Sequence, residues 1–354
     1  MPATEGGPGA GNGPAAEGPA VGGTDPRNGS HLVADVLSQE MARDPSIVVF
    51  GEDVGRLGGV FGATRGLRRR FGDVRVFDTP VSETAFLGMA VGAAQSGLRP
   101  VVELMFVDFA GVGFDQILNQ MAKNHFMSGG RVRLPLVLRA AVGCIGSAAQ
   151  HSQVLSATFA HIPGLKVAYP GSHGDLQGLL VAAIRDDSPV VFLEHKLLYR
   201  HRVGQLPFGD ARPAGATVEP RPFGRLRRIR DGSDVTIVAA GYLVQEALEA
   251  ARRLTGEGFS AGVVDLRTLV PLDRAGLVEE AGRAPGLLVI DDDYTHYGMT
   301  GEVIATVAEA LGRAAPRMAR HGVEGPIPAA RPLEEAVVPS AGSIARAARI
   351  LAGS

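Results

Sequence analysis

Residues 76–86 read VFDTPVSETAF, and the rest of the chain is organised around them. A short apolar strand ends in Asp-Thr-Pro, and the predicted helix from Ala85 to Ala94 consists almost wholly of Ala, Gly, Leu, Met and Val. A helix that is apolar on every side is buried. Its first turn nevertheless carries Glu83, and a buried carboxylate must either be hydrogen-bonded or face an opening that a ligand can reach.

Two interpretations of Glu83 remain open at this stage. In the structural one, Thr79 is the N-cap, Pro80 takes the first helical position and Glu83 interacts with the positive end of the helix. In the functional one, Glu83 is a catalytic or binding carboxylate in a pocket. Capping residues are common and catalytic carboxylates are rare, so the spacing alone does not separate the two interpretations.

The first two hundred residues alternate between apolar strands and helices. Besides the strand before Asp78, strands are predicted over residues 47–50, 101–106, 134–139, 166–169 and 190–194. Helices are predicted over residues 31–43, 85–94, 110–127 and 175–185. Strands this uniformly apolar are covered on both faces. The pattern therefore predicts a six-stranded α/β unit with a doubly wound, mainly parallel sheet.

The chain is expected to divide into four parts. Residues 1–30 are rich in Gly, Pro and Ala, lack the features of a signal or transit peptide, and are predicted to be a disordered tail. The first domain is expected over residues 31–200, and a linker rich in Pro, Gly and Arg over residues 201–230. A smaller α/β domain is expected over residues 231–354, with strands at 235–239, 261–265 and 287–290 and helices at 244–254, 273–282 and 301–311.

Composition limits the classes of function. The 354 residues are 45% hydrophobic and 20% charged, which suits two packed domains. The net charge of −2 gives no sign of a nucleic-acid or membrane partner, and no apolar run approaches the length of a membrane span. The single cysteine, Cys144, excludes an internal disulfide framework and predicts a reducing, cytoplasmic location.

Polar side chains follow successive predicted strands of the first domain. They are Glu83, Asp108 and His151. Because the carboxyl ends of parallel strands meet at one edge of a sheet, a single pocket can collect all three. His151 lies in the loop 143–153, which is more polar than a core histidine needs, although a structural histidine remains the more common alternative.

Other features carry weaker signals. His161, before Ile-Pro-Gly, suggests a structural turn residue, and Cys144 has no cationic neighbour in sequence and is interpreted as inert. The acid run 291–293 follows a strand, where solvated acids are more common than cation sites. The sequence has no Walker loop and no Gly-x-Gly-x-x-Gly between a strand and a helix, so another chain is expected to hold the phosphates of any phosphorylated cofactor.

Ordered motifs give the sequence a resemblance to a known family. From about Leu32 to beyond Val303 it resembles the beta subunit of the thiamine-diphosphate-dependent 2-oxoacid dehydrogenases. The motifs are FGEDVG (50–55), GGVF (58–61), DTPVSE (78–83), GLRPVVE (97–103), DQI (115–117), MSGG (127–130), HSQ (151–153), PGLKV (163–167) and DLRTL (265–269). The resemblance implies a pyrimidine-binding domain followed by a C-terminal domain of transketolase type.

The resemblance also implies a cofactor site shared between chains. The cofactor would be thiamine diphosphate, with its diphosphate and magnesium held by a separate alpha subunit. By motif, Glu83 would bond a ring nitrogen of the aminopyrimidine, and Phe109 would pack on the pyrimidine with Met105 nearby. His151 would lie near the reacting carbon and assist proton transfer as a lipoyl group is acylated.

Further partners follow from the same resemblance. The second domain would pair with a second beta subunit, giving a heterotetramer, and would dock a lipoyl-bearing acyltransferase. Family members often hold a potassium ion near the position of Asp186. The residues that would supply its ligands, mostly through backbone carbonyls, are Leu136, Val137, Ala183, Asp186 and Ser188.

Departures from the family pattern leave the substrate open. The family's Ser-x-Glu after the HSQ motif is replaced by residues 154–156, its Arg-Tyr before MSGG by residues 125–126, and its Pro-Tyr-Ala by residues 327–332. The resemblance predicts oxidative decarboxylation of pyruvate or a branched-chain 2-oxo acid. Acetoin dehydrogenase shares these motifs. A transketolase-like chain would need its own phosphate motif, and a silent scaffold would not need Glu83, Phe109 and His151 together.

Overall fold

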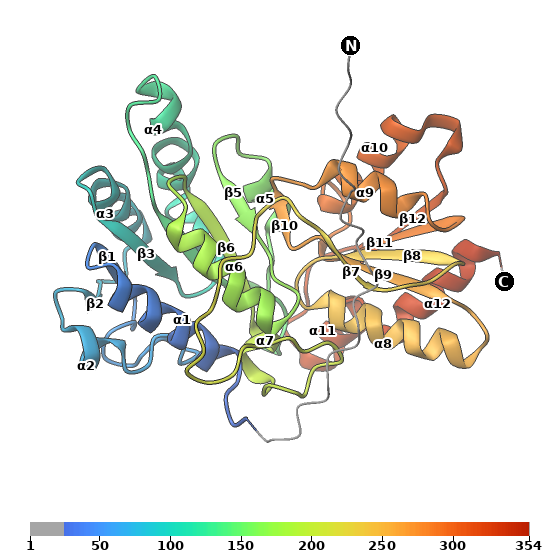
Figure 1. The fold of residues 1–354 in the computed structure, drawn as a ribbon, viewed down its shortest axis with the longest axis horizontal. Coiled ribbons are helices and arrows are strands. Elements are labelled where there is room, and N and C mark those ends of the chain that lie inside the picture. Colours follow the sequence, from blue (N-terminus) through green and yellow to red (C-terminus); the bar gives the residue numbers. More distant parts are fainter. Residues whose placement is uncertain (1–24, 354) are drawn as a thin grey trace, which may run out of the picture.

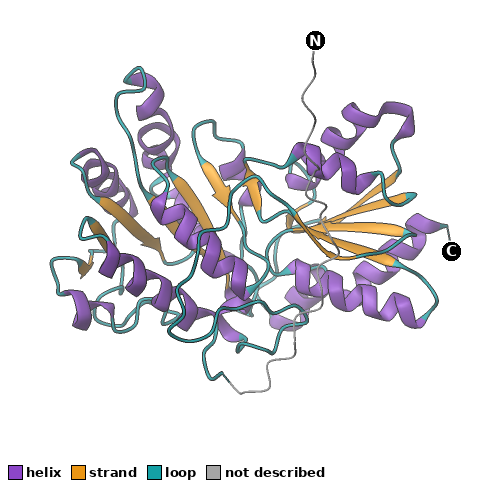
Figure 2. Ribbon diagram, viewed as in Figure 1, coloured by secondary structure: helices purple, strands orange, loops and turns teal. Residues whose placement is uncertain are grey.

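The computed structural model describes residues 25–353 and places two α/β domains side by side (Figure 1). In each domain the strands lie between helices (Figure 2). The predicted tail falls almost wholly outside the described residues. Its last part is not a tail, because Gly29 and Ser30 begin the first helix, which Asn28 caps with its side chain.

The first domain is built on a sheet of seven strands in the order β10-β5-β6-β4-β3-β1-β2. Its strands are β1 (Ile47–Gly51), β2 (Val76–Asp78), β3 (Arg99–Leu104), β4 (Val137–Val142), β5 (Lys166–Ala168), β6 (Val190–His195) and β10 (Thr268–Val270). Its α-helices are α1 (Gly29–Arg43), α2 (Leu67–Phe71), α3 (Glu83–Gln95), α4 (Ala122–Met127), α5 (Ser156–Ala160), α6 (His173–Arg185) and α7 (Lys196–Arg200).

The predicted doubly wound fold is confirmed, with one strand more than expected. Six strands are parallel, and the seventh, β10, pairs antiparallel with β5 although it lies beyond residue 260 in the sequence. Alternate residues of β1 enter different apolar clusters, Val48 and Phe50 on one face and Ile47 and Val49 on the other. Both faces of this sheet are therefore covered, as its uniformly apolar strands predict.

The second domain is built on a five-stranded sheet in the order β12-β11-β8-β9-β7. Its strands are β7 (Arg227–Arg230), β8 (Val235–Ala239), β9 (Ala261–Asp265), β11 (Gly286–Tyr294) and β12 (Arg317–Val323). Its α-helices are α8 (Leu243–Gly256), α9 (Arg274–Ala281), α10 (Met299–Leu311), α11 (Arg331–Val337) and α12 (Ala341–Ala352). Strand β7 lies inside the predicted linker, and the sequence analysis missed every element after α10.

The predicted helix 110–127 is not continuous. It is divided into a 3-10 turn (Val107–Gly111), a π-helical segment (Gln116–Met121) and the short α4. A further 3-10 turn covers Ala149–His151, and another covers Gly312–Ala314. π-helical turns often occur at functional sites. The broken segment lies directly after β3, and its 3-10 turn contains the candidate site residues Asp108 and Phe109.

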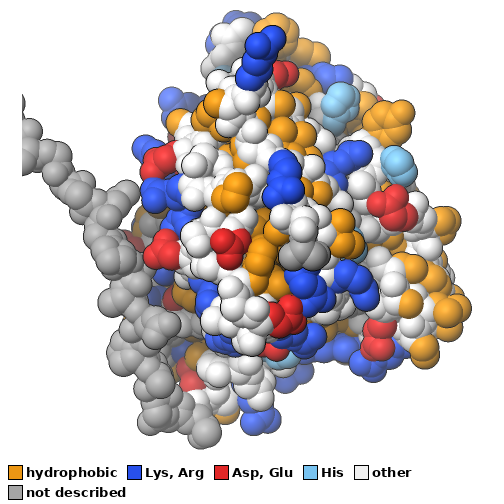
Figure 3. Space-filling view, turned by 90° about the vertical axis from the view of Figure 1, so that its right-hand side faces the viewer, with side chains coloured by type: hydrophobic (Ala, Val, Ile, Leu, Met, Phe, Trp, Pro, Cys, Tyr) orange, Lys and Arg blue, Asp and Glu red, His pale blue; other side chains and the backbone are white. Residues whose placement is uncertain are grey.

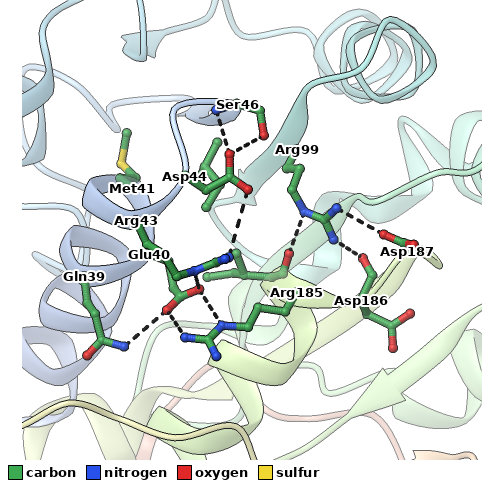
Figure 4. A network of polar contacts seen from close by, with 12 residues as sticks. Gln39, Glu40, Met41, Arg43, Asp44, Ser46, Arg99, Arg185, Asp186 and Asp187 are labelled. Carbon is green, nitrogen blue, oxygen red and sulfur yellow. Dashed lines mark hydrogen bonds and ion pairs between the residues drawn. The ribbon is translucent and has the colours of Figure 1, made fainter.

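Ionic contacts join α1 to α6 on one face of the first sheet (Figure 4). The fully buried Glu40 accepts hydrogen bonds from Arg43 at 2.9 Å and from Arg185 at 2.8 and 2.9 Å. Each charge-assisted bond compensates part of the cost of burying the carboxylate. The two helices are thus fixed on the same face of the sheet.

Basic, acidic and apolar side chains are interspersed on the face of the second domain in Figure 3. Such a surface lacks the single-sign stripe that nucleic-acid binding requires. Among residues 25–353, no helix is long and apolar enough to span a membrane.

Candidate functional site

Glu83 is the first residue of α3, and the N-cap of this helix is Ser82. The capping prediction for Thr79 and Pro80 was therefore wrong: both precede the helix, and no side chain makes a cap hydrogen bond. Only 7% of Glu83 is exposed, and within residues 25–353 its carboxylate forms no hydrogen bond. A nearly buried acid without a partner favours a ligand-binding role over a structural one.

A second carboxylate lies close to Glu83. Glu52 follows β1, is 8% exposed, and its Oε1 atom is buried without a hydrogen-bond partner. Burial raises the pKa of Glu52, and the negative charges of Glu83 and then Asp53 raise it further. Two neighbouring carboxylates with unused oxygen atoms favour a ligand with N–H donors.

We expect Glu52→Gln to raise the thermal unfolding temperature at pH 7. The folded state holds the Glu52 proton more tightly than the unfolded chain does, so the ionised group costs stability at neutral pH. The gain should shrink as the pH is lowered, and vanish below the ordinary pKa of 4.5, where both states are protonated. Thermal scans between pH 7 and 4.5 check this, with exposed Glu309→Gln as the control. A lower unfolding temperature for Glu52→Gln at pH 7 would contradict the prediction.

An aromatic cluster surrounds His151. Its ring lies 4.7 Å from the ring of Phe106 and 5.6 Å from that of Phe109, both edge to face. The Nδ1 atom lies 3.0 Å from the carbonyl oxygen of Ser147. Because a carbonyl only accepts, Nδ1 carries the proton of a neutral ring and Nε2 is left as the acceptor. Met105, half-buried, follows the end of β3.

Asp108 helps to hold the loop that carries His151. Its Oδ1 atom accepts a hydrogen bond from the backbone N–H of Gln153 at 3.3 Å, and burial raises its pKa. The second domain holds the same loop, because Tyr294 donates to the side chain of Gln153 at 2.8 Å. Glu334 accepts from Gly146 N–H at 2.6 Å. The His151 loop is therefore fixed by both domains.

The structure brings some of the predicted residues together and leaves others apart. His151 and Phe109 are in contact, and Asp108 joins them through Gln153. Glu83 lies instead with Glu52 at the ends of the neighbouring strands β1 and β2. No contact among the described residues joins Glu83 to His151.

Lys196 was missed by the sequence analysis. It follows β6, is fully buried, and donates a hydrogen bond to the backbone carbonyl of His151. Its ammonium lies 5.3 Å from the centre of the Phe106 ring. A charged residue directly after a wholly buried strand was the available sequence signal.

Two features with weak sequence signals, Cys144 and the acid run 291–293, can now be compared with the structure. Burial raises the pKa of the Cys144 thiol to about 12, which agrees with an inert cysteine. The acid run was wrongly expected to be solvated: Asp291, Asp292 and Asp293 are buried, because β11 extends through them. Asp292 accepts from Tyr169 and contacts His195 at 3.1 Å. Among residues 25–353, no group of three or more His, Cys, Asp or Glu side chains could hold a metal.

The residues proposed for potassium lie near the starts of β4 and β6 and around the C-terminal end of α6. Arg99 donates to the carbonyl oxygens of Ile184 at 3.1 Å and of Asp186 at 2.7 Å (Figure 4). Lys166 pairs with the Asp186 carboxylate at 2.5 Å. A helix C-terminus attracts cations, and this one already holds two from the protein.

Comparisons with known proteins agree with this architecture. Residues 27–202 match the transketolase pyrimidine binding domain and residues 224–344 the transketolase C-terminal domain. A split-gene transketolase, solved as an inactive beta4 tetramer, has a TM-score of 0.75 over 92% of this chain and 99% of that chain. At 22% identity it shows the fold alone. The fold and the two matched domains thus define a two-domain protein of the thiamine-dependent transketolase type.

Relatives of higher identity narrow the family. The chain is 44% identical to the acetoin:2,6-dichlorophenolindophenol oxidoreductase subunit beta of Cupriavidus necator, over 90% of this chain and 95% of that one. It is 41% identical to the pyruvate dehydrogenase E1 component subunit beta of Rickettsia conorii, over 89% and 95%. It is 42% identical to the 2-oxoisovalerate dehydrogenase subunit beta of Bacillus subtilis, over 77% and 81%. The chain belongs to the family of 2-oxoacid dehydrogenase beta subunits.

Proposed function

We propose that this beta subunit, with an alpha subunit, decarboxylates pyruvate or a branched-chain 2-oxo acid oxidatively and transfers the acyl group to a lipoyl group. The observation that carries the proposal is Glu83, a nearly buried carboxylate without a protein partner at the start of α3. It lies in the domain that matches the pyrimidine-binding family. A ring nitrogen of the cofactor would supply the missing partner.

Each site residue has a proposed role. When bound, thiamine diphosphate supplies the nucleophilic carbon and the electron sink for decarboxylation. Glu83 would share a proton with the pyrimidine ring, and Phe109 with Met105 would pack against that ring. His151, with Nε2 left as the acceptor, would transfer a proton while the acyl group is transferred to the lipoyl sulfur.

Other parts of the proposed function depend on partner chains. In the family that this sequence resembles, a Gly-Asp-Gly motif in the alpha subunit holds the diphosphate and magnesium, and this sequence has no such motif. We infer that an alpha subunit holds both groups here. A second beta subunit and a lipoyl-bearing acyltransferase complete the proposed assembly. We infer a reducing, cytoplasmic location from the low cysteine content of the chain.

The test is a panel of substrates given to this chain co-expressed with the alpha-type subunit encoded beside it. Pyruvate, 3-methyl-2-oxobutanoate, 4-methyl-2-oxopentanoate and acetoin are assayed in parallel with an artificial electron acceptor. Turnover of a 2-oxo acid supports the proposal. Turnover of acetoin alone supports the second candidate, which the 44% identity to an acetoin oxidoreductase subunit favours. Failure to bind the cofactor would favour a silent scaffold.

Potassium is a separate proposal. Backbone carbonyls are good potassium ligands. Ala183 lies in the last turn of α6, while the carbonyls of Leu136 and Ala183 already accept backbone hydrogen bonds from Val190 and Asp186. Lys166 already neutralises the Asp186 carboxylate, so we expect potassium to stabilise the fold rather than to be essential. Replacing potassium chloride with choline chloride at equal ionic strength should lower the unfolding temperature by a few degrees. Equal unfolding temperatures in the two salts would exclude the site.

A further inference from the structure

A fully buried lysine lies beside the candidate site and has no role in the proposed chemistry. Lys196 is 0% exposed, which is unusual because a buried ammonium loses its hydration. The chain has two other lysines, Lys123 and Lys166, and both are partly exposed. A buried charge of this kind is retained in a fold when it holds something that an apolar residue could not hold.

The contacts of Lys196 converge on His151. Its ammonium donates to the backbone carbonyl of His151 and lies over the face of Phe106. The Phe106 ring in turn contacts the His151 ring edge to face. Lys196 therefore fixes both the backbone of His151 and an aromatic wall against which its ring rests.

The position of Lys196 is itself fixed from the second domain. The preceding residue, His195, lies 3.1 Å from the Asp292 carboxylate, and its Nδ1 atom accepts from Leu197 N–H at 3.1 Å. With Nδ1 as acceptor, the proton of a neutral ring is on Nε2 and points to Asp292. Gly143 leaves room for this ring, because a Cβ atom there would lie 2.0 Å from His195 Nε2.

Charge around Lys196 keeps it largely protonated at neutral pH. Burial lowers the pKa of Lys196 to about 8, while the charge of Asp108 opposes that effect. The charge of Glu334 also favours the ammonium form, and the charge of Arg200 disfavours it. The Cys144 thiol, whose pKa is about 12, is neutral at pH 7 and adds no charge. At pH 7 the group therefore still donates a charge-assisted hydrogen bond.

We propose that Lys196 is a positioning residue that holds the His151 loop, residues 144–153, in the geometry needed for acyl transfer. The proposal deepens the proposed function and rests on it for the role of His151. Lys196 does not contact the reacting atoms in this account. Its effect is exerted through the carbonyl of His151 and the ring of Phe106.

The first test measures the loop without requiring activity. Hydrogen–deuterium exchange of residues 144–153 is compared in assemblies that contain wild type, Lys196→Met, Lys196→Arg or the control Lys123→Met. We expect exchange in the loop to be roughly tenfold faster in Lys196→Met, with β4 and β6 unchanged, because the carbonyl of His151 loses its donor. Lys196→Arg and Lys123→Met should resemble wild type. Unchanged loop exchange in Lys196→Met would overturn the proposal.

The second test separates positioning from general structure. Lys196→Met should reduce acylation of the lipoyl domain by roughly tenfold more than it reduces decarboxylation with an artificial acceptor. The wild-type acylation rate should fall above the Lys196 pKa of about 8, and Lys196→Arg should retain activity without this fall. An identical pH profile in wild type and Lys196→Arg would contradict the proposal, even if Lys196→Met fails to fold. An inactive wild type would refute the proposed function, and the exchange result would still decide the role of Lys196 in holding the loop.

Discussion

Replacing Glu83 with alanine should lower the turnover of the assembled enzyme by about a hundredfold or more, the usual effect of losing a positioned proton-transfer group. The reason is structural as well as chemical. Glu83 is nearly buried at the first turn of α3, yet its carboxylate has no partner among the described residues. The proposed function gives this carboxylate a partner in the cofactor.

The measurement is steady-state turnover on the preferred 2-oxo acid at saturating thiamine diphosphate. Glu83→Gln keeps the size of the side chain and should be as impaired, because an amide cannot exchange the proton. Neither variant should unfold at a lower temperature than wild type, since no protein hydrogen bond is lost. Exposed Glu309→Ala is the matched control. Turnover within a fewfold of wild type would remove Glu83 from the mechanism.

Replacing Arg139 with methionine should lower the free energy of unfolding by about 3–5 kcal/mol, the cost of leaving buried charges without their partner. Arg139 on β4 is fully buried. Its guanidinium bonds Glu194 on β6 at 2.8 and 3.1 Å and Glu103 on β3 at 2.7 Å. Burial alone would lower the pKa of Arg139, but the charges of Glu194 and Glu103 outweigh it and raise the pKa.

Urea unfolding followed by far-ultraviolet circular dichroism measures this loss, because the sequence contains no tryptophan to report by fluorescence. Exposed Arg313→Met should change stability little and serves as the control. Adding Glu103→Leu and Glu194→Leu to Arg139→Met should recover much of the stability, because no charge is then left unpaired. A loss below about 1 kcal/mol for the single variant would mean that water reaches the ion cluster.

The core of both domains could be predicted from the sequence. Uniformly apolar strands that alternate with helices predict a parallel sheet covered on both faces. The period of the apolar residues predicted the bounds of α1 and α6 to within about two residues. The motif around Glu83 also indicated a carboxylate at an opening. These features are local, because they depend on which residues are neighbours along the chain.

Other features are decided only where distant segments meet. Strand β10 joins the first sheet from a position beyond the linker, which no local pattern indicates. The acid run at residues 291–293 became buried because β11 continues through it and Tyr169 and Ser156 supply partners from the other domain.

The candidate site also has some features that the sequence predicted and others that only the tertiary structure shows. Sequence motifs named Glu83, Phe109 and His151, but only packing shows Glu52 beside Glu83 and Lys196 beneath His151. The sequence by itself determined the fold class and indicated Glu83 in the first turn of α3. Both depend on local patterns, the apolar periodicity and a short motif, that neighbouring residues form. Tertiary structure decided which charges lie close together, because Coulomb energy and desolvation depend on distances in space rather than on separation along the chain.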